Sequence, residues 1–164
     1  MRVGTGFDVH RFVAGRPLVL GGVEVPFEFG LEGHSDADVL THAIIDAMFG
    51  ATAAGDLGRY FPDTDSAFKD ISSIALLQDA VRILGDKGFR LVNIDVTVVL
   101  ELPKLAPFRE RMREVISAAA GLEVSRVSVK ATTTEGLGFT GRGEGVAAQA
   151  VVLVEEHTLH EERF

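Results

Sequence analysis

The order of the predicted elements indicates an α+β fold, in which helices pack on one face of a mixed β-sheet and a small β-hairpin is added. Period-two apolar patterns predict strands near both ends of the chain and in its middle, and three apolar stripes at helical spacing predict helices between them. The sequence has neither an internal repeat nor a linker, so we expect a single domain over residues 1–156 and a polar tail over residues 157–164.

The first elements are a strand, a hairpin and a helix. The strand ends near His10, and a glycine pair supplies the turn of a hairpin over residues 18–25. Residues 26–33 are expected to form a loop. Ser35 or Asp36 is the expected N-cap of the helix. Its buried stripe comprises Leu40, Ile44, Ala47, Met48 and Ala51.

The rest of the chain follows the same two periodicities. The expected elements are, in order, a loop at 55–65, a helix at about 66–86, a strand at 91–100, a helix between Pro107 and Gly121, a strand at 127–131, a Thr- and Gly-rich loop at 132–145 and a strand at 146–154. Helices that cover one sheet face leave the other face open, and a second subunit is a natural cover for it.

Composition limits the class of protein. The 164 residues carry a net charge of −8, which argues against a nucleic-acid partner. No apolar run is long enough to cross a bilayer, and residues 1–4 open a strand and lack a signal-peptide pattern. We therefore expect a cytoplasmic protein without a membrane partner. The chain has no cysteine, so a metal would be held by His, carboxylate or carbonyl groups.

Asp8, His10 and His42 form the first candidate site. Asp8 and His10 lie two residues apart on a strand, so both side chains point away from the apolar residues at the odd positions. His42 lies on the polar face of the first helix, where Asp38 and Asp46 could orient its ring. One carboxylate and two imidazoles are a ligand set of catalytic zinc. The alternative is a polar strand end and an ordinary surface histidine.

Three other segments could bind an anionic or nucleotide ligand. His34 and Ser35 precede a helix start, where backbone amides attract phosphate, although a plain N-cap explains them too. The loop at 132–145 offers hydroxyls, glycine amides and an arginine for a diphosphate, with Glu135 for Mg²⁺. It could equally be a flexible hairpin loop. The turn at 103–107 could enclose a nucleobase or simply join a strand to a helix.

Three segments carry a resemblance to a known family. They are Gly6-Phe7-Asp8-Val9-His10, then Gly33-His34-Ser35-Asp36-Ala37-Asp38-Val39 with His42-Ala43 and Asp46-Ala47, and finally Lys130-Ala131-Thr132-Thr133-Thr134-Glu135 with residues 138–145. Together they resemble the 2-C-methyl-D-erythritol 2,4-cyclodiphosphate synthases, which close a ring in the non-mevalonate pathway of isoprenoid synthesis. The resemblance covers residues 4–154. It implies a homotrimer whose sheets face a central axis, with active sites between neighbouring subunits.

The reaction that the resemblance implies is an intramolecular phosphoryl transfer, catalysed by a phosphorus–oxygen lyase. The substrate is 4-diphosphocytidyl-2-C-methyl-D-erythritol 2-phosphate, and the products are 2-C-methyl-D-erythritol 2,4-cyclodiphosphate and CMP. The resemblance also implies one zinc ion per subunit on Asp8, His10 and His42. A second divalent ion, Mg²⁺ or Mn²⁺, would bind Glu135 and the substrate diphosphate.

The family's pattern assigns further roles. His34 and Thr133 fall where the transition state is stabilised. The implied substrate-binding residues are Asp8, His10, His34, Ser35, Asp56, Gly58, Phe61, Asp63, Leu100, Pro103, Lys104, Leu105, Ala106, Thr132, Thr133, Thr134, Glu135, Phe139 and Arg142. The family commonly has Ala-Gln where this chain has Leu100-Glu101. If the side chain of residue 101 contacts the base, base preference changes.

Two other functions remain open from the sequence. A metal-dependent hydrolase of a nucleoside diphosphate compound would use water as its nucleophile. A non-catalytic trimeric module would bind a nucleotide, or an isoprenoid diphosphate in a central cavity near Phe139 and Arg142. Turnover of the cytidine substrate distinguishes the three functions.

Overall fold

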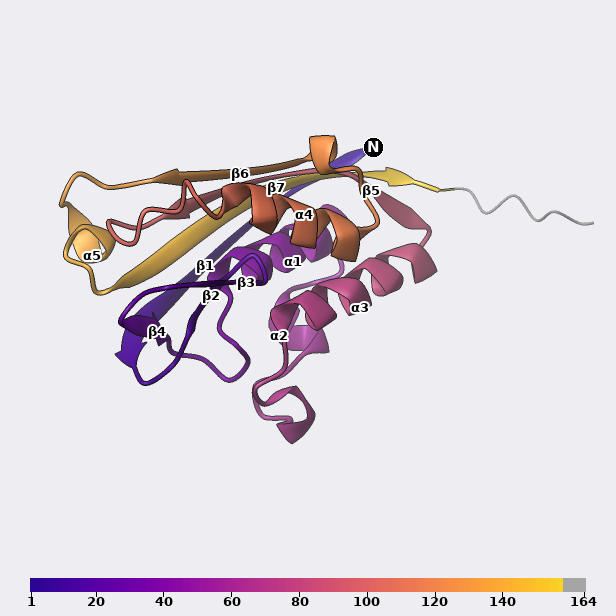
Figure 1. The fold of residues 1–164 in the computed structure, drawn as a ribbon. Coiled ribbons are helices and arrows are strands. Elements are labelled where there is room, and N and C mark those ends of the chain that lie inside the picture. Colours follow the sequence, from indigo (N-terminus) through magenta and orange to yellow (C-terminus); the bar gives the residue numbers. More distant parts are fainter. Residues whose placement is uncertain (158–164) are drawn as a thin grey trace, which may run out of the picture.

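A five-stranded mixed sheet in the order β4-β1-β7-β5-β6 organises residues 1–157, the part of the chain that this computed structural model describes (Figure 1). β5 and β6 are parallel, whereas β1 pairs antiparallel with β4 and β7, and β7 pairs antiparallel with β5. β2 and β3 form a separate hairpin. The strands are β1 (Arg2–Ala14), β2 (Leu18–Leu20), β3 (Val23–Val25), β4 (Phe29–Leu31), β5 (Phe89–Val99), β6 (Val127–Thr132) and β7 (Gly145–Glu156).

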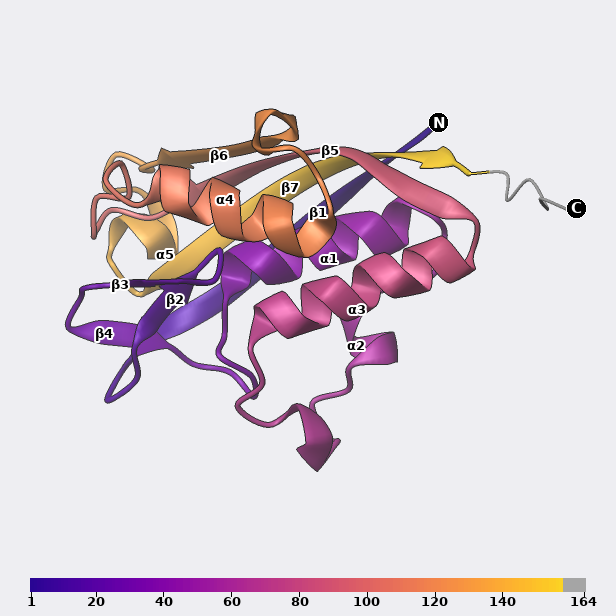
Figure 2. The ribbon, with the colours of Figure 1, turned by 45° about the vertical axis from the view of Figure 1, so that its right-hand side comes forward.

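The three longer helices pack on one face of this sheet. Both views of the ribbon place α1, α3 and α4 on the same side of it (Figures 1 and 2). The helices are α1 (Val39–Ala51), α2 (Leu57–Tyr60), α3 (Ser73–Asp86), α4 (Arg109–Ala120) and α5 (Gly138–Gly141), with 3₁₀ turns at Ser66–Phe68 and Val124–Arg126. The α+β fold expected from the sequence, with a mixed sheet and a small hairpin, is confirmed.

β1 and α1 lie unusually close together because β1 carries glycine where it faces the helix. A methyl group on Gly4 or Gly6 would come within 2.0 Å of the carbonyl oxygen of Ala47 or Ala43, respectively. No side chain fits in that space. The even positions of β1 therefore face α1, and Asp8 and His10 continue this face toward the start of the helix.

The apolar residues at the odd positions of β1 lie on the open face of the sheet. Val3, Phe7 and Val9 are 65%, 62% and 40% exposed, and Val151 of β7 is 38% exposed beside them. The predicted alternation is thus confirmed, and the apolar set is the one that faces away from α1. Monomeric proteins rarely expose a contiguous apolar strip of this kind.

α1 is buried on almost every side because it lies between the sheet and α3. Its predicted stripe of Leu40, Ile44, Ala47, Met48 and Ala51 is buried, and so are residues such as Ile45 and Phe49. A helix that is covered all round needs polar side chains only where they have partners. Asp38 and His42 are two such residues, and both are buried.

Several predicted boundaries were wrong. The predicted loop at 26–33 contains β4, which pairs with the end of β1, and the predicted loop at 55–65 contains α2. The helix expected from residue 66 begins only at Ser73. Asp70 has a φ of 57°, which is incompatible with a continuous right-handed helix, and Ser72 then caps α3.

The N-cap of α1 is Asp38 and not Ser35 or Asp36, because the Asp38 side chain accepts a hydrogen bond from Thr41 N. Apart from His157, the tail predicted over residues 157–164 lies outside the described residues. Within residues 1–157, no helix has both the length and the apolar character that a membrane span requires.

Candidate metal centre

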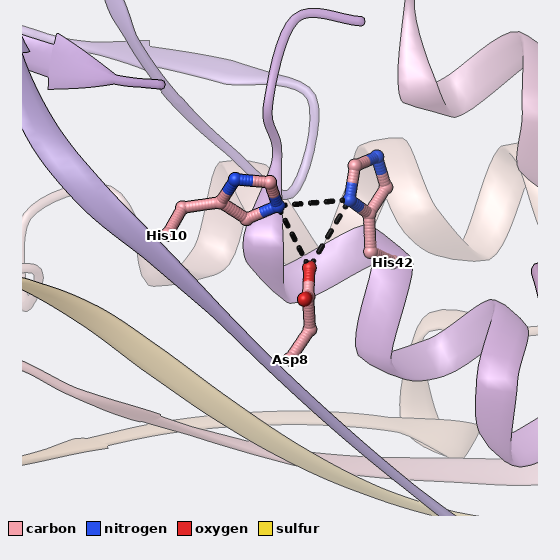
Figure 3. A group of neighbouring side chains, drawn as sticks. All are labelled: Asp8, His10 and His42. Atoms are coloured by element: carbon pink, nitrogen blue, oxygen red, sulfur yellow. Dashed lines mark hydrogen bonds and ion pairs between the residues drawn. The ribbon is translucent and has the colours of Figure 1, made fainter. Parts of the chain in front are cut away.

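Asp8, His10 and His42 come together between β1 and the first turn of α1 (Figure 3). His10 Nε2 lies 2.9 Å from Asp8 Oδ2, His42 Nδ1 lies 3.1 Å from the same oxygen, and the two nitrogens are 3.3 Å apart. The two residues of β1 share a strand face, and the close approach permitted by Gly4 and Gly6 brings His42 opposite them.

These three atoms fit one face of a zinc coordination tetrahedron. Zinc–nitrogen and zinc–oxygen bonds of 2.0–2.1 Å place tetrahedral ligand atoms about 3.3 Å apart. The observed separations of 2.9–3.3 Å are close to that value. Two imidazole nitrogens and one carboxylate oxygen that face one another also form a donor set that suits zinc. The residues present therefore fit a metal ion with a free fourth position.

The ring of His10 is held by the backbone. Its Nδ1 lies 2.5 Å from the carbonyl oxygen of Glu32, which can only accept a hydrogen bond. Nδ1 therefore carries a proton, which leaves Nε2 as the ring atom that can bind a metal. Glu32 is itself fixed, because its N–H donates to the carbonyl of Arg11, 2.9 Å away.

The ring of His42 is held by two serines, in contrast to the sequence prediction. His42 Nε2 lies 2.9 Å from Ser73 Oγ and 3.2 Å from Ser35 Oγ. From their spacing, Asp38 and Asp46 could have oriented this ring, but neither carboxylate is hydrogen-bonded to it in the described chain.

Both aspartates are engaged by backbone amides instead. The Asp38 carboxylate accepts from the amides of Gly21 and Gly22 in the β2–β3 turn, and Asp46 accepts from Leu57 N at 2.7 Å. Spacing along a helix places these side chains near His42, but the unpaired amides of two neighbouring turns attract them more strongly.

The charges in the cluster are tightly linked. Burial alone would raise the pKa of Asp8, but hydrogen bonds and charge interactions with His10 and His42 outweigh burial and hold this pKa well below its usual range. Burial would lower the pKa of His10, but the hydrogen bond and negative charge of Asp8 raise it. The carboxylate is therefore ionised at neutral pH, as a metal ligand must be.

Two adjacent cavities border the cluster. One, of about 310 Å³, is lined by Asp8, His10 and His42 together with His34, Ser35, Phe61 and Asp63. The other, of about 280 Å³, is lined by Asp8 and His42 together with Asp46, Asp56 and Gly58. The predicted site residues that precede residue 64 in the sequence thus lie around the cluster. The hydroxyl of Ser35 is directed at His42, and His34 Nε2 contacts the carbonyl of Asp65 at 3.1 Å.

The remaining predicted residues lie elsewhere on the sheet. In the described chain, residues 100–106 and 132–135 line neither of these two cavities. The strand register explains why: Val9 pairs with Ala147, Ala147 with Val99, and Val99 with Thr132. Three strand spacings separate the backbones of Val9 and Thr132, about 14 Å. Phe139 and His10 do line a common third cavity, of about 680 Å³.

The loop after β6 is held together by its own side chains and by Glu101. Thr133 Oγ1 donates to Glu135 Oε1 at 2.9 Å, and the Glu101 carboxylate accepts from Thr134 N at 3.0 Å and from Gly136 N at 3.4 Å. The side chain at position 101 is therefore directed at this loop. Arg142, predicted to contact a diphosphate, is paired with Glu144 at 2.7 Å.

Sequence reasoning missed two residues of the centre. Ser73 lies 31 positions after His42 and contacts its ring, and nothing in the local pattern indicates this. Arg16 donates to the carbonyl oxygens of Gly33 and Ser35 and so holds the segment that carries His34. Both contacts depend on tertiary packing.

The chain is similar in sequence and in structure to known proteins. A model described as the YgbB family matches residues 1–155. A 2-C-methyl-D-erythritol 2,4-cyclodiphosphate synthase of Syntrophotalea carbinolica is 58% identical over 163 residues, which is 99% of each chain. These matches confirm the resemblance seen in the three motifs.

Solved structures agree. A 2C-methyl-D-erythritol-2,4-cyclodiphosphate synthase with CDP bound has a TM-score of 0.86 and 36% identity, over 94% of this chain and 100% of that one. The bifunctional IspDF of Campylobacter jejuni has a TM-score of 0.91 and 45% identity, and the match covers 94% of this chain but 42% of that longer one.

Proposed function

The chain belongs to the YgbB family, and from that premise we propose that it converts 4-diphosphocytidyl-2-C-methyl-D-erythritol 2-phosphate to 2-C-methyl-D-erythritol 2,4-cyclodiphosphate and CMP. The observation that carries the proposal is the convergence of Asp8, His10 and His42 beside a cavity that also holds His34 and Asp63. In this reaction an oxygen of the 2-phosphate attacks the β-phosphorus of the diphosphate. The bond from that phosphorus to the CMP oxygen breaks, so the enzyme is a phosphorus–oxygen lyase.

The chemistry requires positioning and charge neutralisation and no covalent nucleophile from the protein. Nucleophile and leaving group belong to one molecule, so a site that holds the substrate folded supplies much of the rate. A zinc ion on Asp8, His10 and His42 would polarise a phosphate oxygen and offset the charge that develops during transfer. Glu135 would hold Mg²⁺ or Mn²⁺ against the diphosphate.

Individual residues support this assignment through their contacts. His34 lines the cavity beside Asp8, where an imidazole N–H can donate to a phosphate oxygen. Thr133 donates to Glu135 and so lies where a hydroxyl can meet the diphosphate. Asp56, Gly58 and Asp63 surround the two cavities and offer acceptors for the hydroxyl groups of the methylerythritol part.

Residues 100–106 form the proposed base pocket. Because the Glu101 side chain is directed at the loop after β6, recognition of cytosine falls to the backbone of this turn. The departure from the family's Ala-Gln pattern then leaves base preference unchanged. Phe139, which lines the third cavity beside His10, and Arg142, which is paired with Glu144, are also assigned to substrate binding.

We assign the complete active site to an interface between subunits of a homotrimer. Within one chain the metal cluster and the loop that carries Glu135 line separate regions, and a neighbouring copy can bring its own loop to this cluster. The exposed strip of Val3, Phe7, Val9 and Val151 on the open sheet face supports association through that face, with the sheets around a central axis. A cytoplasmic location stays a prediction of the sequence.

A ³¹P NMR time course on the cytidine substrate, with Zn²⁺ and Mg²⁺ present, tests the proposal. Paired cyclodiphosphate resonances that grow together with CMP are expected. Open-chain phosphate products would instead identify a metal-dependent hydrolase. Binding of the substrate without turnover would identify a non-catalytic diphosphate-binding module and would contradict the proposed reaction.

A further inference from the structure

We propose that Asp36 and Ser73 are positioning residues for the metal centre, because together they fix the tautomer and the orientation of the His42 ring. This makes the first residue of α3 part of a centre whose ligands lie on β1 and α1. The inference rests on the proposed function only in assuming that Asp8, His10 and His42 bind a metal.

The hydrogen-bond directions follow from the number of protons available. Ser73 Oγ lies 2.5 Å from Asp36 Oδ1 and 2.9 Å from His42 Nε2. A serine hydroxyl has one proton, and a carboxylate can only accept. Ser73 must therefore donate to Asp36 and accept from His42. Nε2 then carries a proton, which leaves Nδ1, the atom that faces Asp8 and His10, as the ring atom that can bind a metal.

Ser35 also lies near this nitrogen but cannot set the tautomer by itself. Its hydroxyl oxygen is 3.2 Å from His42 Nε2 and accepts from Ala37 N, also at 3.2 Å. The proton of that hydroxyl is not committed to a carboxylate, so Ser35 could either donate to the ring or accept from it. The shorter contact, and the one with a fixed direction, is that of Ser73.

Asp36 is itself held by hydrogen bonds, so it can fix the direction of the Ser73 hydroxyl. Its Oδ2 accepts from Ser73 N at 2.9 Å, and its own N–H donates to Ile71 O at 3.1 Å. Next to this pair, Asp70 N donates to His34 O at 2.9 Å. With the bond from the Ser73 hydroxyl, four hydrogen bonds thus join residues 34–36 to residues 70–73, and Ser73 is fully buried.

The consequence is a ligand that is ready for a metal before the metal arrives. Partners of this kind, which hold the far nitrogen of a metal-bound histidine, typically contribute about 10- to 100-fold in metal affinity. His10 has a backbone carbonyl in that role, which mutation cannot remove, whereas His42 depends on two side chains. His42 is therefore the ligand at which such a contribution can be measured.

The test compares zinc affinity in the Ser73→Ala chain and the wild-type chain, by competition with a chromophoric chelator. We expect Ser73→Ala to bind zinc about 10- to 100-fold more weakly. The visible absorption of the Co²⁺-loaded protein should change in intensity, since it reports ligand geometry. Ser72→Ala is the matched control, because Ser72 caps the same helix and, within residues 1–157, its side chain makes no hydrogen bond to His42. It should lower the melting temperature and leave zinc affinity unchanged.

Asp36→Asn tests the same inference by a substitution that conserves side-chain volume, whereas Ser73→Ala removes a buried hydroxyl group. An asparagine at this site either loses its bond to Ser73 N or points its amide N–H at Ser73 Oγ, which turns the serine proton toward His42. Zinc affinity should fall in both cases, and this variant carries the test if Ser73→Ala does not fold. Wild-type affinity and an unchanged Co²⁺ spectrum in Asp36→Asn would overturn the inference. A wild-type chain that binds no zinc would instead overturn the metal site and the proposed function.

Discussion

The two halves of the proposed active site are built differently. The metal half, formed by Asp8, His10 and His42, lies on a strand and a helix, and each histidine is held from behind by a fixed acceptor. The loop half, which carries Thr133 and Glu135, is exposed and is held mainly by hydrogen bonds to Glu101 and within the loop. Groups that must meet a small ion are placed on rigid elements, while groups that meet a flexible substrate lie on a loop.

Removal of one proposed metal ligand should have the largest effect on zinc binding and turnover. His42→Ala leaves two ligands, so zinc binding should be lost and turnover should fall by about a thousandfold or more, because a metal contributes several kcal/mol to phosphoryl transfer. Zinc content and the ³¹P NMR rate measure both effects. His157→Ala, the same change at an exposed position, should retain wild-type turnover. Zinc retained by the His42 variant would contradict the assigned ligand set.

The close packing of β1 on α1 is the next test of the metal half. In Gly6→Ala the new methyl group meets backbone atoms at 2.0 and 2.6 Å, so the strand must move away from the helix. We expect the free energy of unfolding to fall by about 3 kcal/mol or more, with weaker zinc binding, as urea titrations will measure. Gly85→Ala in α3 meets open space and should raise stability by about 0.5–1 kcal/mol. Equal stability of the two variants would show that the contact is not required.

The loop half should respond more mildly and in a different measurement. Glu101→Ala removes the acceptor for two amides of the loop, so KM for the cytidine substrate should rise about tenfold while zinc affinity stays unchanged. Glu101→Gln keeps an acceptor oxygen and should lie much closer to the wild type. Steady-state kinetics with cytidine and uridine substrates will measure both variants. A change in base preference in Glu101→Gln would mean that this side chain contacts the base.

The local periods of the sequence were sufficient to predict which faces of the strand and the helix carry Asp8, His10 and His42, and the resemblance then grouped the three as candidate ligands. Asp8 and His10 share a strand face, and His42 lies near the start of a helix, and the structure brings these faces together. The predictions that were wrong or missing concern contacts between distant segments, which the periodicity of a single segment does not indicate. Asp38 has the right spacing to reach His42, but the amides of Gly21 and Gly22 bind its carboxylate. The role of Ser73 depends on how α3 packs against α1.

Boundaries were predicted less well than elements, for a similar reason. β4 was taken for a loop because a three-residue strand has no period to detect, and it forms only because the end of β1 pairs with it. The start of α3 was misplaced because a single residue in the left-handed region, Asp70, breaks an otherwise continuous pattern. The separation of the metal half from the loop half follows from sheet order, which a single sequence does not contain.

The pairing of β1 with β7 also has a consequence for the order of events during synthesis. Arg2 pairs with Val154 and His10 with Val146, so the strand that leaves the ribosome early stays without one of its neighbours until almost all of the described chain has been made. Asp8 and His10 lie on this strand, β1. A nascent chain that stops before β7 therefore leaves the edge of β1 beside Asp8 and His10 without its partner strand.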